Sequence, residues 1–232
     1  MQISNPIIEI SNVSKVYKVY KNSVTALKNI NLKLYDNEFC ALFGPSGSGK
    51  STLLNLIGLI DKPTTGSILL EGLDVTKLDH KKLSNLRLKQ IGFIFQKYYL
   101  LDELNCIENT AIPALAKEGF SKDVVSKAKH LLELVGLKDR LRHKPKHLSE
   151  GEKQRVAIAR SLINEPRILL CDEPTASLDA DNGNAVLDLL TKINAEKGVM
   201  VFLVTHDEMH LKYAKRIIYI RNALISNDTQ RT

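Results

Sequence analysis

The chain has 232 residues, 44% of them hydrophobic, with 33 Lys and Arg against 26 Asp and Glu, which gives a formal charge of +7. This length supports one sizeable core, and the composition excludes collagen-like, disulfide-scaffold and intrinsically disordered chains. The basic excess suits nucleotide phosphate, anionic lipid or nucleic acid, although a solvated lysine-rich surface is the simpler interpretation.

The first third of the chain has the pattern of strands joined by turns. Residues 7–13 and 24–34 have strand character, and the second run ends at a turn in which Asn37 tolerates a left-handed backbone. Residues 39–43 are wholly apolar, which is typical of a buried parallel strand. A helix is predicted over residues 51–60 because leucine and isoleucine recur there at helical spacing.

Later in the chain a helical segment interrupts a strand–helix alternation. A strand over residues 91–95 precedes the helical segment, in which a helix is predicted over residues 124–135 with its end at Gly136. A strand, a helix and two strands are predicted next, over residues 167–171, 185–193, 199–204 and 217–220. This alternation predicts a largely parallel sheet covered on both faces, with the helical segment as an insertion into it.

The cysteines and the N-terminal residues indicate the compartment. Cys40, Cys106 and Cys171 are far apart and odd in number, so we expect buried free thiols in a reducing environment. Residues 1–9 lack a signal-peptide pattern, and no uncharged run approaches the roughly 18 residues of a membrane helix. We therefore expect a soluble, cytoplasmic chain that reaches a membrane only through a partner.

Residues 44–51 read Gly-Pro-Ser-Gly-Ser-Gly-Lys-Ser, which fits G-x-x-x-x-G-K-[ST] between a predicted buried strand and a predicted helix. Glycines let the backbone wrap an anion, and the start of the helix adds its positive dipole end. Lys50 can reach the β- and γ-phosphates of ATP, and the Ser51 hydroxyl can ligate Mg²⁺. The alternative is a Gly/Ser-rich turn that contains a lysine by chance. We predict instead an ATP site formed by Gly44, Pro45, Ser46, Gly47, Ser48, Gly49, Lys50, Ser51 and Thr52.

Two adjacent carboxylates, Asp172 and Glu173, end the predicted strand over residues 167–171. Side chains alternate along a strand, so the two carboxylates should face different ways. Asp172 can hold Mg²⁺, directly or through water, while Glu173 can polarise the attacking water. Such a pair is often only a solvated strand end, but a phosphate loop in the same chain favours the functional interpretation.

Residues 148–155, Leu-Ser-Glu-Gly-Glu-Lys-Gln-Arg, resemble the signature segment of the ATP-binding-cassette (ABC) ATPases, whose usual form is Leu-Ser-Gly-Gly followed by Gln or Glu. Other marks of that family follow in order between about residues 7 and 226. Gln96 is similar to its Q-loop glutamine, residues 177–179 resemble its D-loop, and His206 resembles its switch histidine.

The resemblance implies an α/β fold of the P-loop NTPase type. It has a mostly parallel sheet, an N-terminal antiparallel β part and an inserted helical subdomain over about residues 97–160. Residues 1–232 are then one ATP-binding domain, with ATP and Mg²⁺ as its cofactors. The implied catalytic residues are Lys50, Glu173 and His206. The implied metal ligands are Ser51, Gln96 and Asp172.

The resemblance also implies further contacts with ATP. Gln96 and His206 approach the γ-phosphate, although a polar strand end or an ordinary surface histidine is the alternative. Tyr17 lies where the family places an aromatic ring against adenine, but Tyr20 is close in sequence and an ordinary strand aromatic is also an option. Asp179 is as well suited to holding the backbone of its own loop as it is to contacting the nucleotide.

Two copies of such a chain pack head to tail and share two ATP molecules. The resemblance implies that Ser149, Gly151 and Glu152 of one copy contact the ATP held by the other. Glu150 replaces the usual first glycine, and a carboxylate beside a desolvated triphosphate is unfavourable. We therefore expect Glu150 to point away or to lie by the helix N-terminus, where its charge is tolerated.

These features predict the ATPase subunit of an ABC transporter, acting as a homodimer on membrane permease subunits at the inner face of the cell membrane. The residues that flank the motifs are most similar to those of the lipoprotein-releasing and macrolide-export group, which moves lipids, lipoproteins, peptides or drugs. An amino-acid importer ATPase and a non-transport, cell-division-type ATPase are the alternatives. Residues 97–101 are either a docking surface for the permease or part of the core. No nucleic-acid partner is expected, because the basic residues 138–147 lack interleaved aromatics.

Overall fold

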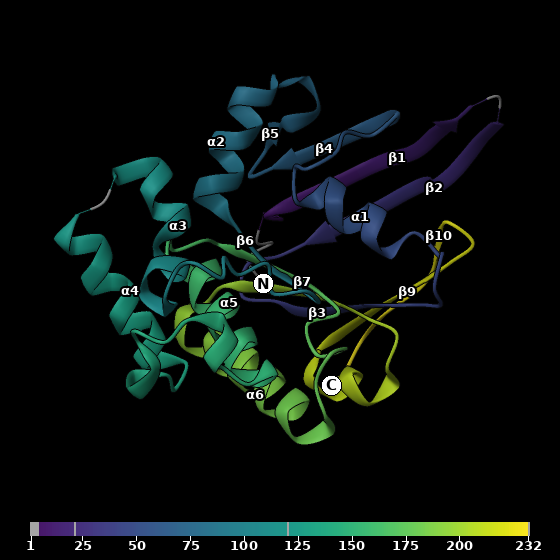
Figure 1. Ribbon diagram of the computed structural model, residues 1–232. Helices are drawn as coiled ribbons and strands as arrows, with labels where there is room; N and C mark the ends of the chain where they lie inside the picture. The colour runs from purple at the N-terminus through teal and green to yellow at the C-terminus, as the bar shows by residue number, and fades with distance from the viewer. Residues whose placement is uncertain (1–4, 21, 120, 232) are drawn as a thin grey trace.

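Two β-sheets with helices packed on and between them form the computed structural model, which describes residues 5–20, 22–119 and 121–231 (Figure 1). The larger sheet has six strands in the order β10-β9-β3-β8-β7-β6. Its strands are β3 (Phe39–Phe43), β6 (Ile91–Phe95), β7 (Ile168–Asp172), β8 (Met200–Thr205), β9 (Arg216–Arg221) and β10 (Leu224–Gln230). All neighbours pair in parallel except β10, which runs antiparallel to β9. The predicted parallel core is therefore confirmed.

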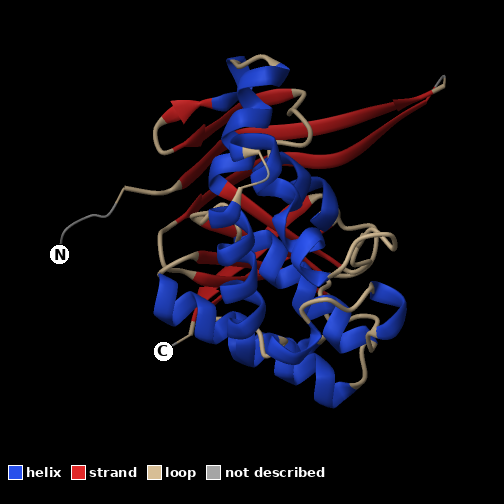
Figure 2. Cartoon of the chain, turned by 60° about the vertical axis from the view of Figure 1, so that its left-hand side comes forward, coloured by secondary structure: helices blue, strands red, loops and turns tan. Residues whose placement is uncertain are grey.

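The smaller sheet is antiparallel, in the order β2-β1-β4-β5. Its strands are β1 (Ile8–Val19), β2 (Asn22–Leu34), β4 (Thr65–Leu70) and β5 (Leu73–Asp74). Figures 1 and 2 both show β1 and β2 projecting from the rest of the chain as a long hairpin. β1 is longer than predicted because it continues past residue 13 through register shifts that keep its pairing with β2.

The helices divide into those beside the antiparallel sheet and those on the other side of the parallel sheet (Figures 1 and 2). Their bounds are α1 (Lys50–Ile57), α2 (His80–Gln90), α3 (Cys106–Glu118), α4 (Lys122–Leu134), α5 (Glu150–Leu162) and α6 (Ala180–Lys197). Short 3-10 helices cover Val75–Lys77, Lys138–Arg140, Pro145–His147 and Glu208–Tyr213. None of the helices in the described ranges combines the length and apolar character that a membrane span requires.

The six-stranded sheet separates two hydrophobic cores. Cys40 and Leu42 of β3 face a core shared with α1 and the antiparallel sheet, whereas Phe39 and Ala41 face a core shared with α3 to α6. This alternation is the period of two that a strand imposes on its side chains, so a short apolar run serves both faces at once. Cys40, Cys106 and Cys171 are buried free thiols, as predicted.

Boundaries differ from the predictions where local signals are weak. The first helix ends at Ile57, three residues early, because the chain turns at Gly58 and Leu59, whose φ is 56°. Helix α2, strands β4 and β5, and strand β10 were not predicted. Asn37 adopts the expected left-handed backbone, with φ at 59°. Because β3, β8, β7 and β6 are parallel neighbours, their carboxyl ends lie together at one edge of the sheet.

Candidate ATP site

The phosphate loop connects β3 to α1 and is held in shape by its own lysine. Lys50 is buried, and its ammonium donates hydrogen bonds to the carbonyls of Gly44 at 2.8 Å and Pro45 at 3.0 Å. Gly49, which precedes the helix, has a φ of 108°, and a Cβ there would lie 2.5 Å from the Ala26 carbonyl. Glycine is therefore required at this position for both backbone conformation and space.

The loop also presents polar groups that suit an anion. Ser51 is exposed in the first turn of α1, where backbone N–H groups have no helical partners. The Ser48 hydroxyl is buried without a hydrogen-bond partner among the described residues. A buried hydroxyl without a partner is costly, so a phosphate oxygen at this loop would satisfy it.

Asp172 ends β7 next to this loop. Burial raises the pKa of the Asp172 carboxyl, Glu173 raises it further, and the Lys50 ammonium opposes both. Within the described ranges no ion pair involves Asp172. A desolvated carboxylate without a paired cation, together with the Ser51 hydroxyl, supplies the oxygen ligands that Mg²⁺ prefers. Among the described residues, no group of three or more His, Cys, Asp or Glu side chains is arranged so that it could hold a metal ion.

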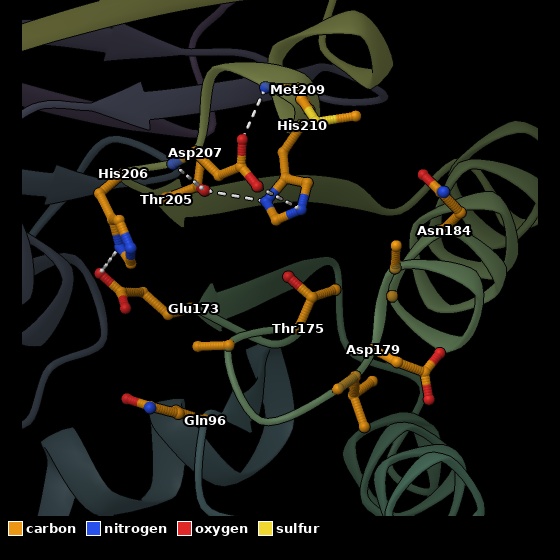
Figure 3. Close-up of a pocket in the computed structure, with 14 residues that line it drawn as sticks. Gln96, Glu173, Thr175, Asp179, Asn184, Thr205, His206, Asp207, Met209 and His210 are labelled. Atoms are coloured by element: carbon orange, nitrogen blue, oxygen red, sulfur yellow. Dashed lines mark hydrogen bonds and ion pairs between the residues drawn. The ribbon is translucent and has the colours of Figure 1, made fainter.

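Glu173 faces the histidine that follows β8. The Nδ1 atom of His206 lies 2.9 Å from Oε1 of Glu173, although the two residues are 33 positions apart (Figure 3). Glu173 has a left-handed backbone with φ at 46°, and its N–H donates to the Val204 carbonyl at 3.0 Å. This backbone conformation turns the chain sharply at the end of β7, and a strained non-glycine residue of this kind is typical of functional sites.

A second histidine supports the segment that carries His206. The Thr205 hydroxyl accepts a hydrogen bond from the Asp207 N–H at 3.0 Å and lies 3.0 Å from Nδ1 of His210 (Figure 3). Burial lowers the pKa of His210, the Asp207 carboxylate opposes this, and His206 adds to it. This network was not predicted, because its signal in the sequence is no more than a second histidine four positions after His206.

Glu173, His206 and the residues around His210 line a cavity of about 490 Å³, whereas the phosphate loop and Asp172 do not line it. Gln96 from the end of β6 faces it from one side, and Asp179 at the start of α6 faces it from another (Figure 3). Asp179 caps α6 by accepting from the Asn182 N–H at 2.9 Å. Of the predicted residues, Gln96, Glu173 and His206 thus share one wall, whereas Ser149, Gly151 and Glu152 do not line this cavity.

Tyr17 is held beside the phosphate loop. Its hydroxyl donates to Asp61 at 2.8 Å, and the ammonium of Lys15 lies 4.8 Å from the centre of its ring. Burial raises the pKa of Tyr17, the bond to Asp61 adds to this, and the Thr52 hydroxyl of the phosphate loop opposes it. Tyr20, the other candidate, directly follows β1 and is fully exposed. Asp61 had not been predicted and carries no motif of its own.

The signature segment forms the N-terminus of α5. Ser149 is its N-cap: the Ser149 hydroxyl accepts from the Glu152 N–H at 3.2 Å, and the Glu152 carboxylate accepts from the Ser149 N–H at 2.8 Å. Glu152 also accepts from Nε of Arg140 at 2.9 Å, so both of its oxygens are engaged within its own chain. Gly151 is covered by Asn182, whose Oδ1 would lie 2.8 Å from a Cβ.

Glu150 lies in the first turn of α5, one of the two arrangements that we expected. Its carboxylate pairs with the Lys153 ammonium at 2.7 Å and is more than half exposed. The hydrogen bond from Lys153 lowers the pKa of Glu150. A negative charge is favourable at this end of a helix, which explains how the chain accommodates a residue that departs from the usual glycine.

Comparison with known proteins agrees with this geometry. The family model described as "ABC transporter" matches residues 27–176. The chain is 44% identical over 218 residues to the uncharacterized ABC transporter ATP-binding protein MJ1508 of Methanocaldococcus jannaschii, covering 94% of this chain and 97% of that protein. It is 43% identical to the macrolide export ATP-binding/permease protein MacB of Bdellovibrio bacteriovorus over 95% of its length, but spans only 34% of that protein.

Among solved structures, the dimeric post-hydrolysis state of the ATP-binding cassette MJ0796, bound to ADP and Pi, matches with a TM-score of 0.89 at 38% identity. The match covers 97% of this chain and 99% of that one. The cbiO1 protein of Clostridium perfringens, part of the transporter complex cbiONQ, matches with a TM-score of 0.88 at 26% identity. The α/β fold class of ABC cassettes is therefore confirmed.

Proposed function

Because the chain belongs to the ABC transporter family as one of its ATP-binding, ATP-hydrolysing cassettes, we propose that it is the motor subunit of a transporter with a separate permease. Two copies pack head to tail at the inner face of the membrane. The observation that carries this proposal is the Glu173–His206 pair, which lies at the sheet edge where the phosphate loop begins after β3. Dimeric relatives and the ATP-binding/permease name of MacB support it.

In the proposed mechanism the phosphate loop binds the triphosphate, and Lys50 exchanges its loop carbonyls for the β- and γ-phosphate oxygens. Ser51, Gln96 and Asp172 would hold Mg²⁺, which would neutralise charge on those oxygens when bound. Glu173 orients and deprotonates the attacking water. His206 holds the γ-phosphate and, through its contact with Glu173, keeps that carboxylate in line. Positioning and charge neutralisation carry most of the catalysis in this chemistry.

The second copy completes each site in this proposal. The Ser149 hydroxyl and the Gly151 N–H cap the γ-phosphate from across the dimer, at the positive end of α5. The Glu152 carboxylate is engaged by Ser149 and Arg140, so we assign it the role of holding the cap in shape. ATP binding then closes the dimer, and hydrolysis opens it.

For the cargo we propose export or release of a lipid, lipoprotein, peptide or drug. The support is that MacB proteins from three organisms are 40–43% identical to this chain. Reconstitution with the permease, followed by ATPase assays with macrolide, lipid, lipopeptide and amino acid, tests this part. Stimulation by amino acid alone contradicts the export proposal, and activity without any transported compound favours the non-transport, cell-division-type alternative.

The Glu173→Gln variant tests the catalytic assignment. Because glutamine keeps the shape but cannot accept the proton, turnover should fall below detection, and ATP should trap a stable dimer visible by size-exclusion chromatography with light scattering. Glu208→Gln, which changes a carboxylate that does not line the catalytic cavity, is the matched control. Turnover at the wild-type rate in Glu173→Gln means that another group activates the water.

A further inference from the structure

Gln154 is a completely buried polar residue in the signature helix α5. Its Nε2 donates to the Pro174 carbonyl at 2.7 Å and lies 3.5 Å from the Phe95 carbonyl. Both neighbours at that end of the amide are acceptors, so the amide nitrogen must face them. Pro174 directly follows Glu173, and Phe95 directly precedes Gln96. One side chain therefore holds the backbone next to two of the proposed ATP-site residues.

The other end of the same amide is unfavourable for stability. Its Oε1 is buried and has no hydrogen-bond partner within the described ranges. Leaving an acceptor unsatisfied in a protein interior is destabilising, whereas an apolar side chain of the same shape would pack there without that cost. Val156, Ile158 and Ala159 of the same helix show that apolar residues fit this environment. A locally unfavourable residue next to a site is expected where function requires it.

The turn after β7 depends on the bond that Gln154 supplies. Glu173 has a left-handed backbone, and its carbonyl accepts from the Ala176 N–H at 3.2 Å. Pro174 has no N–H, so its carbonyl is the only hydrogen-bonding group on the backbone of that residue. Gln154 anchors that carbonyl from α5, the helix that begins at Ser149.

We propose that Gln154 is a positioning residue for ATP hydrolysis. It acts through the backbone on Glu173 and Gln96, and it fixes both relative to the end of the helix that carries the signature segment. This inference rests on the proposed roles of Glu173 and Gln96. It predicts that removing the donor slows the hydrolysis step without removing ATP affinity, because Lys50 and the phosphate loop are untouched.

The Gln154→Met variant tests this proposal, since methionine has a similar length and shape but no donor. We expect kcat to fall about tenfold or more, the size of effect that small misplacements of catalytic groups produce. The KM for ATP should change less than about twofold. Tm should stay close to that of the wild type or fall, because the unsatisfied Oε1 is removed but the buried Pro174 carbonyl loses its donor. Ser161→Ala is the matched control: Ser161 is buried on the same helix, and among the described residues its hydroxyl bonds to the Ile158 carbonyl alone, at 2.7 Å.

Hydrogen exchange supplies a second readout that stays informative if the variant is less stable. Amides of residues 175–178 should exchange faster in Gln154→Met, while those in the middle of α6 keep their protection. Wild-type kcat in a folded Gln154→Met variant, or unchanged exchange at residues 175–178, overturns the proposal. If Glu173→Gln retains turnover, the assignment of Glu173 fails, and the exchange result still reports whether Gln154 anchors the turn.

Discussion

The Nδ1 atom of His206 lies 2.9 Å from a carboxylate oxygen of Glu173, and this contact joins the ends of two adjacent parallel strands, β7 and β8. When Nδ1 donates a hydrogen bond to Glu173, Nε2 of the neutral imidazole can accept from the attacking water, and Nε2 of the doubly protonated imidazolium can donate to the γ-phosphate. The contact thus restricts the carboxylate and selects the histidine tautomer at the same time. Sequence alone placed both residues near the site but did not pair them.

This relationship predicts the effect of removing the imidazole. His206→Ala should lower kcat by about 100-fold, the cost of losing one preorganised donor at a reacting centre. ATP affinity should change little, because the phosphate loop is intact. Steady-state phosphate release measures the rate, and His80→Ala on α2 is the surface control. A loss confined to KM would show that His206 serves binding and not the chemical step.

Tyr17 and Tyr20 can be separated by paired substitutions. If Tyr17 stacks on adenine, Tyr17→Ala should weaken ATP binding by about tenfold, because base–aromatic stacking is worth about 1–3 kcal/mol. Tyr17→Phe keeps the ring and loses the hydroxyl's contacts with Asp61 and Thr52, so its affinity should stay close to that of the wild type. Titration with a fluorescent ATP analogue measures both.

The control for that experiment is Tyr20→Ala, since Tyr20 is fully exposed and should have no effect. Equal losses for Tyr17→Ala and Tyr17→Phe would mean that the hydroxyl and Asp61 matter, and not the ring. A loss of ATP affinity in Tyr20→Ala would mean that Tyr20, at the end of the hairpin, contacts adenine.

How far the sequence predicts the molecule depends on how local each signal is. The phosphate loop and the strand 39–43 are defined within a few residues, so both were placed correctly. Helix α2 was missed because Leu83 is its only buried residue, which leaves little helical periodicity to detect. Strand β10 is almost wholly exposed and lies at the sheet edge, so it also lacks an apolar pattern.

Contacts between distant segments could not be predicted from the sequence for a different reason. The bond from Gln154 to the Pro174 carbonyl involves backbone, which has no residue-specific signal. The same holds for the two carbonyls that Lys50 contacts. The capping box of Ser149 and Glu152 does have a sequence signature, Ser-x-x-Glu, but these residues were predicted as contacts to ATP and not as a helix cap.

That capping box gives stability a defined pH dependence. The hydrogen bond from the Ser149 N–H lowers the pKa of Glu152, burial opposes this, and Arg140 lowers it further. A carboxyl whose pKa is depressed in the folded state stabilises the fold above its unfolded value, 4.5 here, and this contribution is lost as pH falls through the folded pKa.

Glu152→Gln should therefore lower the free energy of unfolding at pH 7, by about 1 kcal/mol as for other helix caps. The difference from the wild type should shrink once the pH falls below 4.5. Urea titrations between pH 7 and pH 3.5 measure it. Glu150→Gln is the control, because its exposed pair with Lys153 contributes little. A constant difference across this range would mean that charge is not the cause.

Replacing Glu150 by the glycine usual in the family separates stability from turnover. Glu150→Gly removes a favourable charge from the first turn of α5 and adds backbone freedom, so the free energy of unfolding should fall by about 0.5 kcal/mol. Turnover should be unchanged or higher, because a carboxylate near the second copy's triphosphate no longer opposes closure. Glu150→Gln isolates the charge, since it keeps a side chain at that position. Comparing ATPase rates with urea midpoints for both variants decides the matter: a severe loss of turnover in either one would show that Glu150 contributes to the site instead of being tolerated beside it.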